Sequence, residues 1–226
     1  MRILLINPPI REWAKPNVLP LGLAYIASVL RENKISVEIL DLNVLRWDQE
    51  KVKKYIKESD YDVYGIGAIV TIYKYVKWLI ETIKVAHPEA KVIIGGSIAS
   101  SVPDIILNKT KADMVCLGEG EVTIVELVNA LISKKGLNQV KGIYFKEKFG
   151  DIIKNDPRPP INDLDSIPFP AWDLFPVDTY LKNPIGALNR NKWIDGGSNN
   201  CEIFSMNLSG TRGCPYECIY CYHDFM

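Results

Sequence analysis

Residues 3–9 read ILLINPP, an apolar run closed by an asparagine and two prolines. A continuous apolar run of this kind is typical of a strand buried on both faces of a parallel sheet. Apolar runs that end in turn-forming residues recur at residues 37–41, 63–67, 92–97 and 114–120. The pattern therefore predicts five strands, each ending in a turn.

Helical periodicity fills the gaps between these runs. Apolar residues spaced at i, i+3, i+4 and i+7 predict helices around residues 23–30, 52–56, 72–83 and 124–131. We expect Thr71 to cap the third of these helices, and Pro103 to open a further short one. Strands alternating with helices predict an α/β fold over residues 1–140. We expect a doubly wound, Rossmann- or flavodoxin-like sheet of five parallel strands in the order 2-1-3-4-5.

In such sheets ligands bind beyond the carboxyl ends of the strands. Small, turn-forming residues gather there: Asn7, Pro8 and Pro9; Gly67 and Ala68; Gly95, Gly96 and Ser97; Gly118, Glu119 and Gly120. Glycine lets a ligand approach the backbone closely, but glycines also end strands in any α/β protein. Each turn alone favours a purely structural role, whereas all of them on one edge favour a binding edge.

Residues 209–225 read SGTRGCPYECIYCYHDF and hold three of the five cysteines. Cys214, Cys218 and Cys221 form a C-x-x-x-C-x-x-C array. Soft thiolate ligands this close together select zinc, copper or an iron–sulfur cluster. Three thiolates are one short of the usual four around a cubane cluster, which leaves one iron open to a ligand that is not protein.

Zinc is the main alternative to an iron–sulfur cluster in this array. His223 could complete a structural Cys₃His zinc site. A disulfide is disfavoured, because no signal peptide precedes the first strand and intracellular thiols stay reduced. Cys116 lies in an apolar run and is predicted to be a core residue, and Cys201 is assigned no role.

With Tyr220 just before its third cysteine, the array resembles the cluster loop of the radical S-adenosylmethionine (SAM) family. The resemblance implies that the three cysteines hold a [4Fe–4S] cluster whose open iron binds SAM. In that family an electron from the cluster cleaves SAM to a 5′-deoxyadenosyl radical. Tyr220 would then lie among the cofactor-binding residues.

The first half of the chain resembles the cobalamin-binding domain found upstream of radical SAM domains. The resemblance rests on NPP at residues 7–9, LPLGLAYIASVL at 19–30, IIGGS at 93–97 and LGEGE at 117–121. It implies a groove for the nucleotide tail of cobalamin lined by Gly95, Gly96 and Ser97. It also implies that Thr71 and the turn of Gly118, Glu119, Gly120 and Glu121 approach the corrin edge, with Asn7, Pro8 and Pro9 on the same binding edge.

One motif of the wider cobalamin-binding superfamily is missing. Its D-x-H-x-x-G motif supplies a histidine below the cobalt, whereas residues 7–13 here read NPPIREW. This absence is typical of the radical SAM-linked branch, in which the protein provides no histidine to cobalt. His87 precedes Pro88 at a predicted helix end, and we expect it to be a surface residue away from the binding edge.

After a predicted hairpin over residues 143–153, seven of the fourteen prolines fall between residues 157 and 184. We expect residues 141–200 to be a hairpin and a proline-rich linker in which Trp172 and Phe175 are packing anchors. Residues 201–226 would begin a radical SAM domain, with residues 203–208 as the first strand of a (β/α)₆ barrel. Such a barrel needs about 200 residues. We therefore expect a fragment, a truncated product or a first subunit, completed by a second chain or a further C-terminal region.

The charge is balanced, with 27 basic and 27 acidic residues, and no basic stripe suggests nucleic-acid binding. No apolar run approaches the ~20 residues of a membrane span, and a cytoplasmic protein is expected. The hypothesis is the cobalamin-binding portion of a cobalamin-dependent radical SAM enzyme of the methyltransferase type, not catalytically complete alone. The alternative is a non-catalytic cobalamin carrier with a vestigial or zinc-bound cysteine tail. A phosphate-binding Rossmann enzyme is disfavoured, because no G-x-G-x-x-G follows the first strand.

Overall fold

The computed structural model describes residues 1–11, 13–147, 150–183, 205–214 and 216. Its strands are β1 (Arg2–Asn7), β2 (Ser36–Asp41), β3 (Val63–Gly67), β4 (Lys91–Gly95), β5 (Met114–Cys116), β6 (Ile143–Lys146) and β7 (Ile152–Lys154). Its helices are α1 (Leu21–Glu32), α2 (Leu42–Leu45), α3 (Gln49–Glu58), α4 (Tyr73–Ala86), α5 (Ser97–Ser101), α6 (Pro103–Lys109), α7 (Glu121–Ile132) and α8 (Val177–Leu181). Short 3₁₀ turns are η1 (Val70–Ile72), η2 (Leu137–Gln139), η3 (Leu164–Ser166) and η4 (Trp172–Leu174).

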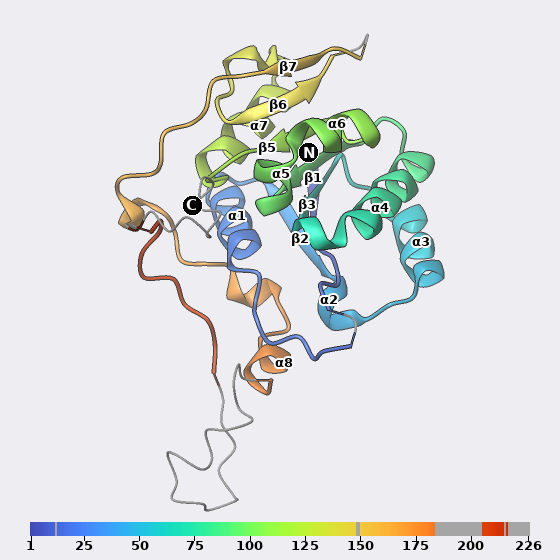
Figure 1. Cartoon of the computed structure of the whole chain (residues 1–226), viewed down its shortest axis with the longest axis vertical. Helices are drawn as coiled ribbons and strands as arrows, with labels where there is room; N and C mark the ends of the chain where they lie inside the picture. Colours follow the sequence, from blue (N-terminus) through green and yellow to red (C-terminus); the bar gives the residue numbers. More distant parts are fainter. Residues whose placement is uncertain (12, 148–149, 184–204, 215, 217–226) are drawn as a thin grey trace, which may run out of the picture.

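The strands form one sheet in the order β2-β1-β3-β4-β5-β6-β7 (Figure 1). Strands β1 to β5 are parallel, and the order 2-1-3-4-5 predicted from the sequence is confirmed. The predicted hairpin joins the same sheet, since β6 pairs antiparallel with β5 and β7 antiparallel with β6. The α/β fold class is thereby confirmed, with two antiparallel strands added at one edge.

Successive side chains of a strand point to opposite faces of the sheet, so alternate residues of each strand pack into two separate cores. In β1, Leu4 and Ile6 face a core built with α3, α4, α5 and α6. Ile3 and Leu5 face a second core built with α1 and α7. Figure 1 shows α1 and α7 on one side of the sheet and α3 and α4 on the other. Both faces are therefore covered, which explains why the strands read as continuous apolar runs.

The proline-rich stretch after β7 folds back over α1 (Figure 1). The amide of Ala171 donates to the carbonyl of Ala24 at 3.1 Å, and Ala171 joins the core on that side of the sheet. Phe175 is buried in a third cluster, against which Trp172 is partly buried. The prediction that these two aromatics anchor the linker is confirmed.

A buried polar network closes the carboxyl end of β1 and β2. The Asn7 amide nitrogen donates to Asp41 Oδ1 at 2.8 Å, and the Tyr180 hydroxyl of α8 donates to Asp41 Oδ2 at 2.6 Å. Tyr180 is 1% exposed and Asp41 is 4% exposed. Burial raises the pKa of the Asp41 carboxyl above its ordinary value, although the hydrogen bonds from Tyr180 and Asn7 pull it down. The network ties the linker helix to the ends of two strands.

Two local predictions were wrong, and a third was right in place but not in exposure. Thr71 lies inside η1 and does not cap α4, whose N-cap residue Ile72 makes no side-chain hydrogen bond. Residues 205–208, the described part of the predicted barrel strand, are not in a strand. His87 lies at the end of α4, as predicted, but it is half-buried: its Nε2 lies 2.6 Å from the Ile56 carbonyl, and its ring stacks on Tyr64.

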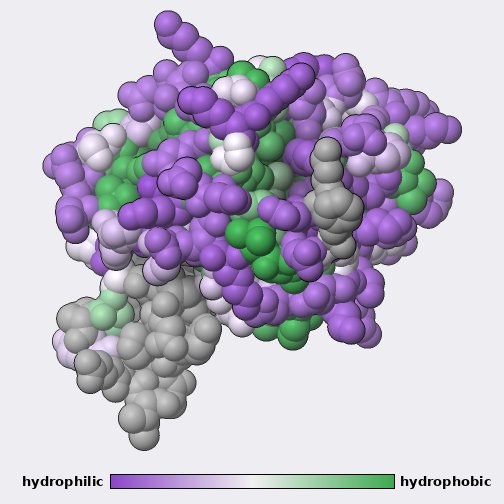
Figure 2. All heavy atoms as spheres, turned by 90° about the horizontal axis from the view of Figure 1, so that it is seen from above, coloured by the Kyte–Doolittle hydropathy of each residue, from purple (hydrophilic) through white to green (hydrophobic). Residues whose placement is uncertain are grey.

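Within the described residues, no helix is both long and apolar enough to cross a membrane. Seen from above, the surface is mostly hydrophilic, and hydrophobic residues appear in patches between polar ones (Figure 2). This view agrees with a fold whose apolar side chains are mainly buried against the sheet faces.

Replacing Tyr180 with phenylalanine removes a buried donor to Asp41 and is expected to lower the free energy of unfolding by about 1–3 kcal/mol. Because the folded-state pKa of Asp41 already lies above its ordinary 3.8, ionisation of Asp41 costs stability as the pH rises through that folded value. Tyr180 favours the ionised form, so its loss raises this pKa further. The destabilisation should therefore be larger at neutral than at acidic pH. Urea unfolding at neutral and at acidic pH measures the free energy of unfolding of the variant. Tyr216→Phe is the control, because the Tyr216 ring is exposed. An equal effect at both pH values would contradict the coupling.

Candidate functional site at the carboxyl edge of the sheet

The turns after β4 and β5 lie side by side at the carboxyl edge of the sheet. The Gly118 amide donates to the Ser100 hydroxyl at 3.2 Å and so links the β5–α7 turn to α5. Helix α5 begins at Ser97 and also contacts η1, which holds Thr71. The structure therefore brings together around α5 the turn of Gly95, Gly96 and Ser97, the η1 turn that holds Thr71, and the turn that begins at Gly118. Helix α5 is a short helix that the sequence did not predict.

The glycines of this edge serve different purposes. A Cβ on Gly95 or Gly118 would meet no heavy atom within 4 Å, so open space lies beside the backbone at both positions. A Cβ on Gly96 would lie 2.6 Å from the Ala68 carbonyl oxygen, and on Gly120 2.9 Å from the Ile26 side chain. Gly96 is thus required by a backbone contact, and the clash at Gly120 involves only the end of a flexible side chain, whereas Gly95 and Gly118 leave space that a ligand could use.

The turn after β1 differs from the others, because Asn7, Pro8 and Pro9 are all buried. The Asn7 amide is held by Asp41 and contacts the Tyr180 hydroxyl at 3.4 Å. This turn supports the ends of β1 and β2 beneath α8, while Thr71, Gly96 and Gly118 are exposed.

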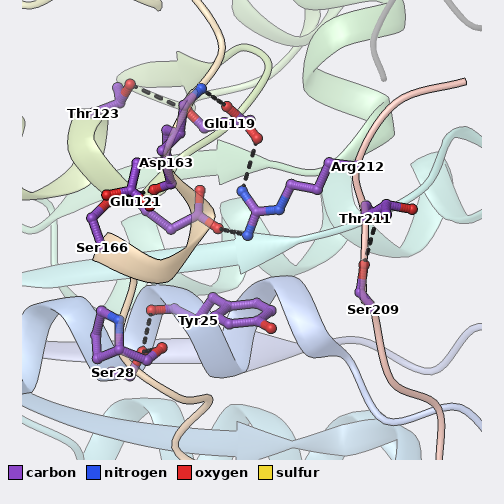
Figure 3. Close-up of polar contacts among 12 residues, drawn as sticks. Tyr25, Ser28, Glu119, Glu121, Thr123, Asp163, Ser166, Ser209, Thr211 and Arg212 are labelled. Atoms are coloured by element: carbon purple, nitrogen blue, oxygen red, sulfur yellow. Dashed lines mark hydrogen bonds and ion pairs between the residues drawn. The ribbon is translucent and has the colours of Figure 1, made fainter. Parts of the chain in front are cut away.

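Glu119 and Glu121 both point toward Arg212 of the C-terminal segment (Figure 3). Arg212 Nη1 donates to Glu119 Oε1 at 2.9 Å, and Arg212 Nη2 donates to Glu121 Oε1 at 2.6 Å. Glu119 also accepts from the backbone amide of Ile161 in the linker. The sequence assigned Arg212 neither a role nor a partner, and it placed the turn of these glutamates only at a ligand edge. No sequence pattern could have paired residues 91 and 93 positions apart.

Of the predicted metal ligands, the structure describes Cys214, which is exposed and not in a disulfide. Cys218, Cys221 and Tyr220 lie outside the described residues, as do Cys201 and His223. Cys116 is 8% exposed, and burial raises the pKa of its thiol to about 12. The prediction that Cys116 is a core residue is confirmed, because it belongs to the core built with α1 and α7. A thiol so hard to ionise is also a poor metal ligand or nucleophile.

The sequence pattern of the B12 binding domain family matches residues 10–128, more than half of the chain. The chain belongs to the B12-binding domain family. The match covers the strands from β2 to β5 and the turns that surround α5. The resemblance of the first half of the chain to a cobalamin-binding domain is therefore confirmed.

Curated relatives match nearly the whole chain. An uncharacterized methyltransferase of Pyrococcus horikoshii is 32% identical over 228 residues, which cover 98% of this chain and 45% of that protein. The cytidylyl-2-hydroxyethylphosphonate methyltransferase of Streptomyces wedmorensis is 28% identical, over 97% of this chain and 47% of its own. An anaerobic magnesium-protoporphyrin IX monomethyl ester cyclase of Rubrivivax gelatinosus is 26% identical, over 98% and 38%. The chain spans less than half the length of these relatives.

Solved structures share the fold. The cobalamin-dependent S-adenosylmethionine radical enzyme OxsB, with aqua-cobalamin bound, superposes with a TM-score of 0.67 at 21% identity. That match covers 76% of this chain and 24% of the other. The radical SAM methyltransferase TsrM of Kitasatospora setae, with cobalamin and a [4Fe–4S] cluster bound, gives 0.61 at 20% identity, over 74% and 31%. At these identities the comparison concerns the fold alone.

The contrast between Gly95 and Gly96 can be tested by stability. Gly96→Ala combines a φ of +79° with a backbone clash and should lower the free energy of unfolding by on the order of 1–3 kcal/mol. Gly95→Ala adds a methyl group to open space and should change it little. Urea denaturation of both variants measures the difference. Equal destabilisation by the two substitutions would show that the turn is not held against Ala68.

Proposed function

We propose that this chain binds cobalamin at the carboxyl edge of its sheet, as the cobalamin-binding portion of a cobalamin-dependent radical SAM enzyme of the methyltransferase type. The observation that carries the proposal is the pair of adjoining turns that leave open space beside Gly95 and Gly118. Ligands of doubly wound sheets bind at this edge, and the family match includes both turns.

The residues present are compatible with a large, tailed cofactor. The backbone beside Gly95 and Gly118 can be approached without displacing any side chain. Between them, Ser97 and Ser100 are half-buried, and the Ser100 hydroxyl accepts the Gly118 amide. In this role Gly95, Gly96 and Ser97 would line the groove for the nucleotide tail, and Gly118 and Thr71 would border the corrin.

When bound, cobalamin would supply a cobalt centre that carries a methyl group, and a cluster would supply the electron that cleaves SAM. This chain's own residues would bind and orient these groups. Cys214, Cys218 and Cys221 are the proposed cluster ligands, with Tyr220 beside them. Methyl transfer is carried over from methyltransferases among the relatives, two of which are named above, whereas the cyclase has another reaction in its name. The turns around α5 are proposed to bind the cofactor, and no residue is proposed to bind the substrate.

The cobalamin part is tested by titrating the chain with hydroxocobalamin and reading visible absorption. We expect the unmodified chain to bind and Gly95→Leu, which fills the open space, to bind at least about tenfold more weakly, or about 1.4 kcal/mol. Gly136→Leu is the matched control, because Gly136 also has open space beside it but follows α7 away from this edge. Absence of binding to the unmodified chain would refute cobalamin binding. Undiminished binding by Gly95→Leu would refute the site.

The cysteine part is tested by anaerobic reconstitution with iron and sulfide. We expect a broad iron–sulfur absorption band that disappears in the triple variant Cys214→Ala, Cys218→Ala, Cys221→Ala, because three thiolates bind the cluster. Cobalamin binding should be the same in both proteins, since the two cofactors occupy separate sites. Stoichiometric zinc without any iron–sulfur band would instead support the carrier module with a zinc-bound tail.

A further inference from the structure

The segment that leads into the cysteine array is anchored to the α/β domain at two points. The Asn207 side chain accepts from the Leu19 amide and donates to the Leu19 carbonyl, both at 3.0 Å. Five residues later, Arg212 pairs with Glu119 and Glu121. Both anchors use polar groups that lie far away in the sequence. The segment is therefore held by specific hydrogen bonds and ion pairs as well as by packing.

Arg212 occupies a socket formed by three elements (Figure 3). Glu119 comes from the β5–α7 turn, Glu121 from the first turn of α7, and the Tyr25 ring of α1 lies 5.2 Å from the guanidinium carbon. A guanidinium held by carboxylates on one side and an aromatic face on another is restricted in position as well as in charge. Burial lowers the pKa of Arg212, but the hydrogen bonds that Arg212 donates to Glu121 and Glu119 outweigh the effect of burial, so the pKa is raised.

The socket is built into the domain rather than formed by mobile side chains. Glu121 is 6% exposed. Within the described part of the chain, it forms an ion pair with Arg212. A buried carboxylate without a partner is costly, so the domain with Glu121 in this position favours an occupied socket. Glu119 is further held by the Ile161 amide of the linker. The receiving carboxylates are therefore fixed by α7 and by the linker.

The turn of residues 118–121 makes two different kinds of contact. Its backbone at Gly118 faces α5 and the open space of the proposed cofactor site, while its two glutamates hold Arg212. Cys214 follows Arg212 after one glycine, Gly213, with φ of +81°. Two residues of chain span at most about 7 Å, so a fixed Arg212 restricts the α-carbon of Cys214 to that range.

We propose that the Glu119–Gly120–Glu121 turn is a docking socket for the cysteine-bearing segment and that Arg212 is the positioning residue that places Cys214 beside the cofactor edge. The docking is a property of the chain without cofactors. The interpretation that this docking places a cluster ligand near cobalamin rests on the function proposed above.

The first test follows limited proteolysis by proteinase K on the full chain without cofactors, with cuts assigned by mass spectrometry. Arg212→Met should accelerate cleavage within residues 205–214 at least about tenfold, because the protease needs a locally released chain. Arg31→Met is the control: Arg31 Nη1 donates to both carboxylate oxygens of Asp173, at 2.7 and 2.8 Å, away from this segment. Cleavage within 205–214 should be unchanged in the control.

Because Arg212→Met leaves Glu121 without its partner, the double variant Glu121→Gln, Arg212→Met is made as well. It removes the buried charge together with the contact, and circular dichroism checks that the domain is folded. Faster cleavage in a folded double variant supports the socket. Cleavage at the unmodified rate in the folded double variant overturns it.

A second readout reports position at Cys214 itself. A nitroxide is attached to Cys214 in a background of Cys201→Ser, Cys218→Ser and Cys221→Ser, with buried Cys116 left in place. Electron paramagnetic resonance should show a more mobile label in Arg212→Met and a partial return in Arg212→Lys, which keeps the charge but not the fork. Equal mobility in all three proteins would refute the positioning role. Since neither readout uses a cofactor, the socket can fail or hold independently of cobalamin binding.

Discussion

The structure depends on covering both faces of a parallel sheet. Buried strands cannot be joined by tight hairpins when they run parallel, so each connection crosses one face as a helix. The two cores that result, one under α3 and α4 and one under α1 and α7, leave every strand-to-helix turn at the same edge. The candidate site at that edge is a consequence of this arrangement. What the individual residues add is the difference between turns that are filled and turns that remain open.

Much of the fold follows from local patterns in the sequence. The run ILLINPP, the helical spacing around residues 72–83 and the glycines after residue 94 each predict an element from a few neighbouring residues. Strand order also followed, because the chirality of crossovers leaves few alternatives. The errors arose where tertiary contacts override local preference. Thr71 has the side chain of a cap, yet the chain makes a 3₁₀ turn there and α5 packs against it.

The site was predicted less completely than the fold, for a physical reason. Glycine-rich turns identify an edge, but only neighbouring atoms decide whether a glycine is there for packing or for access. Gly96 is required by the Ala68 carbonyl, while Gly95, its neighbour in sequence, faces open space. The pairing of Asp41 with Tyr180 spans 139 positions, and that of Glu121 with Arg212 spans 91. Such partners depend on the completed sheet and leave no periodic signal in the sequence.

These long-range pairs share one arrangement. Each joins a segment that follows the α/β domain in sequence to a polar group at the carboxyl edge: Tyr180 to Asp41 at β2, Ile161 to Glu119 after β5, and Arg212 to Glu119 and Glu121. Asp41, Glu119 and Glu121 at this edge are paired within the chain itself, and among the described residues no side chain comes within 4 Å of a Cβ placed on Gly95 or Gly118. An edge lined with unpaired carboxylates would be costly for a large cofactor to cover, because each unpaired charge would be buried beneath it. The edge therefore separates two tasks that meet in one turn: its backbone leaves room for a ligand, and its side chains hold the segment that carries the cysteines.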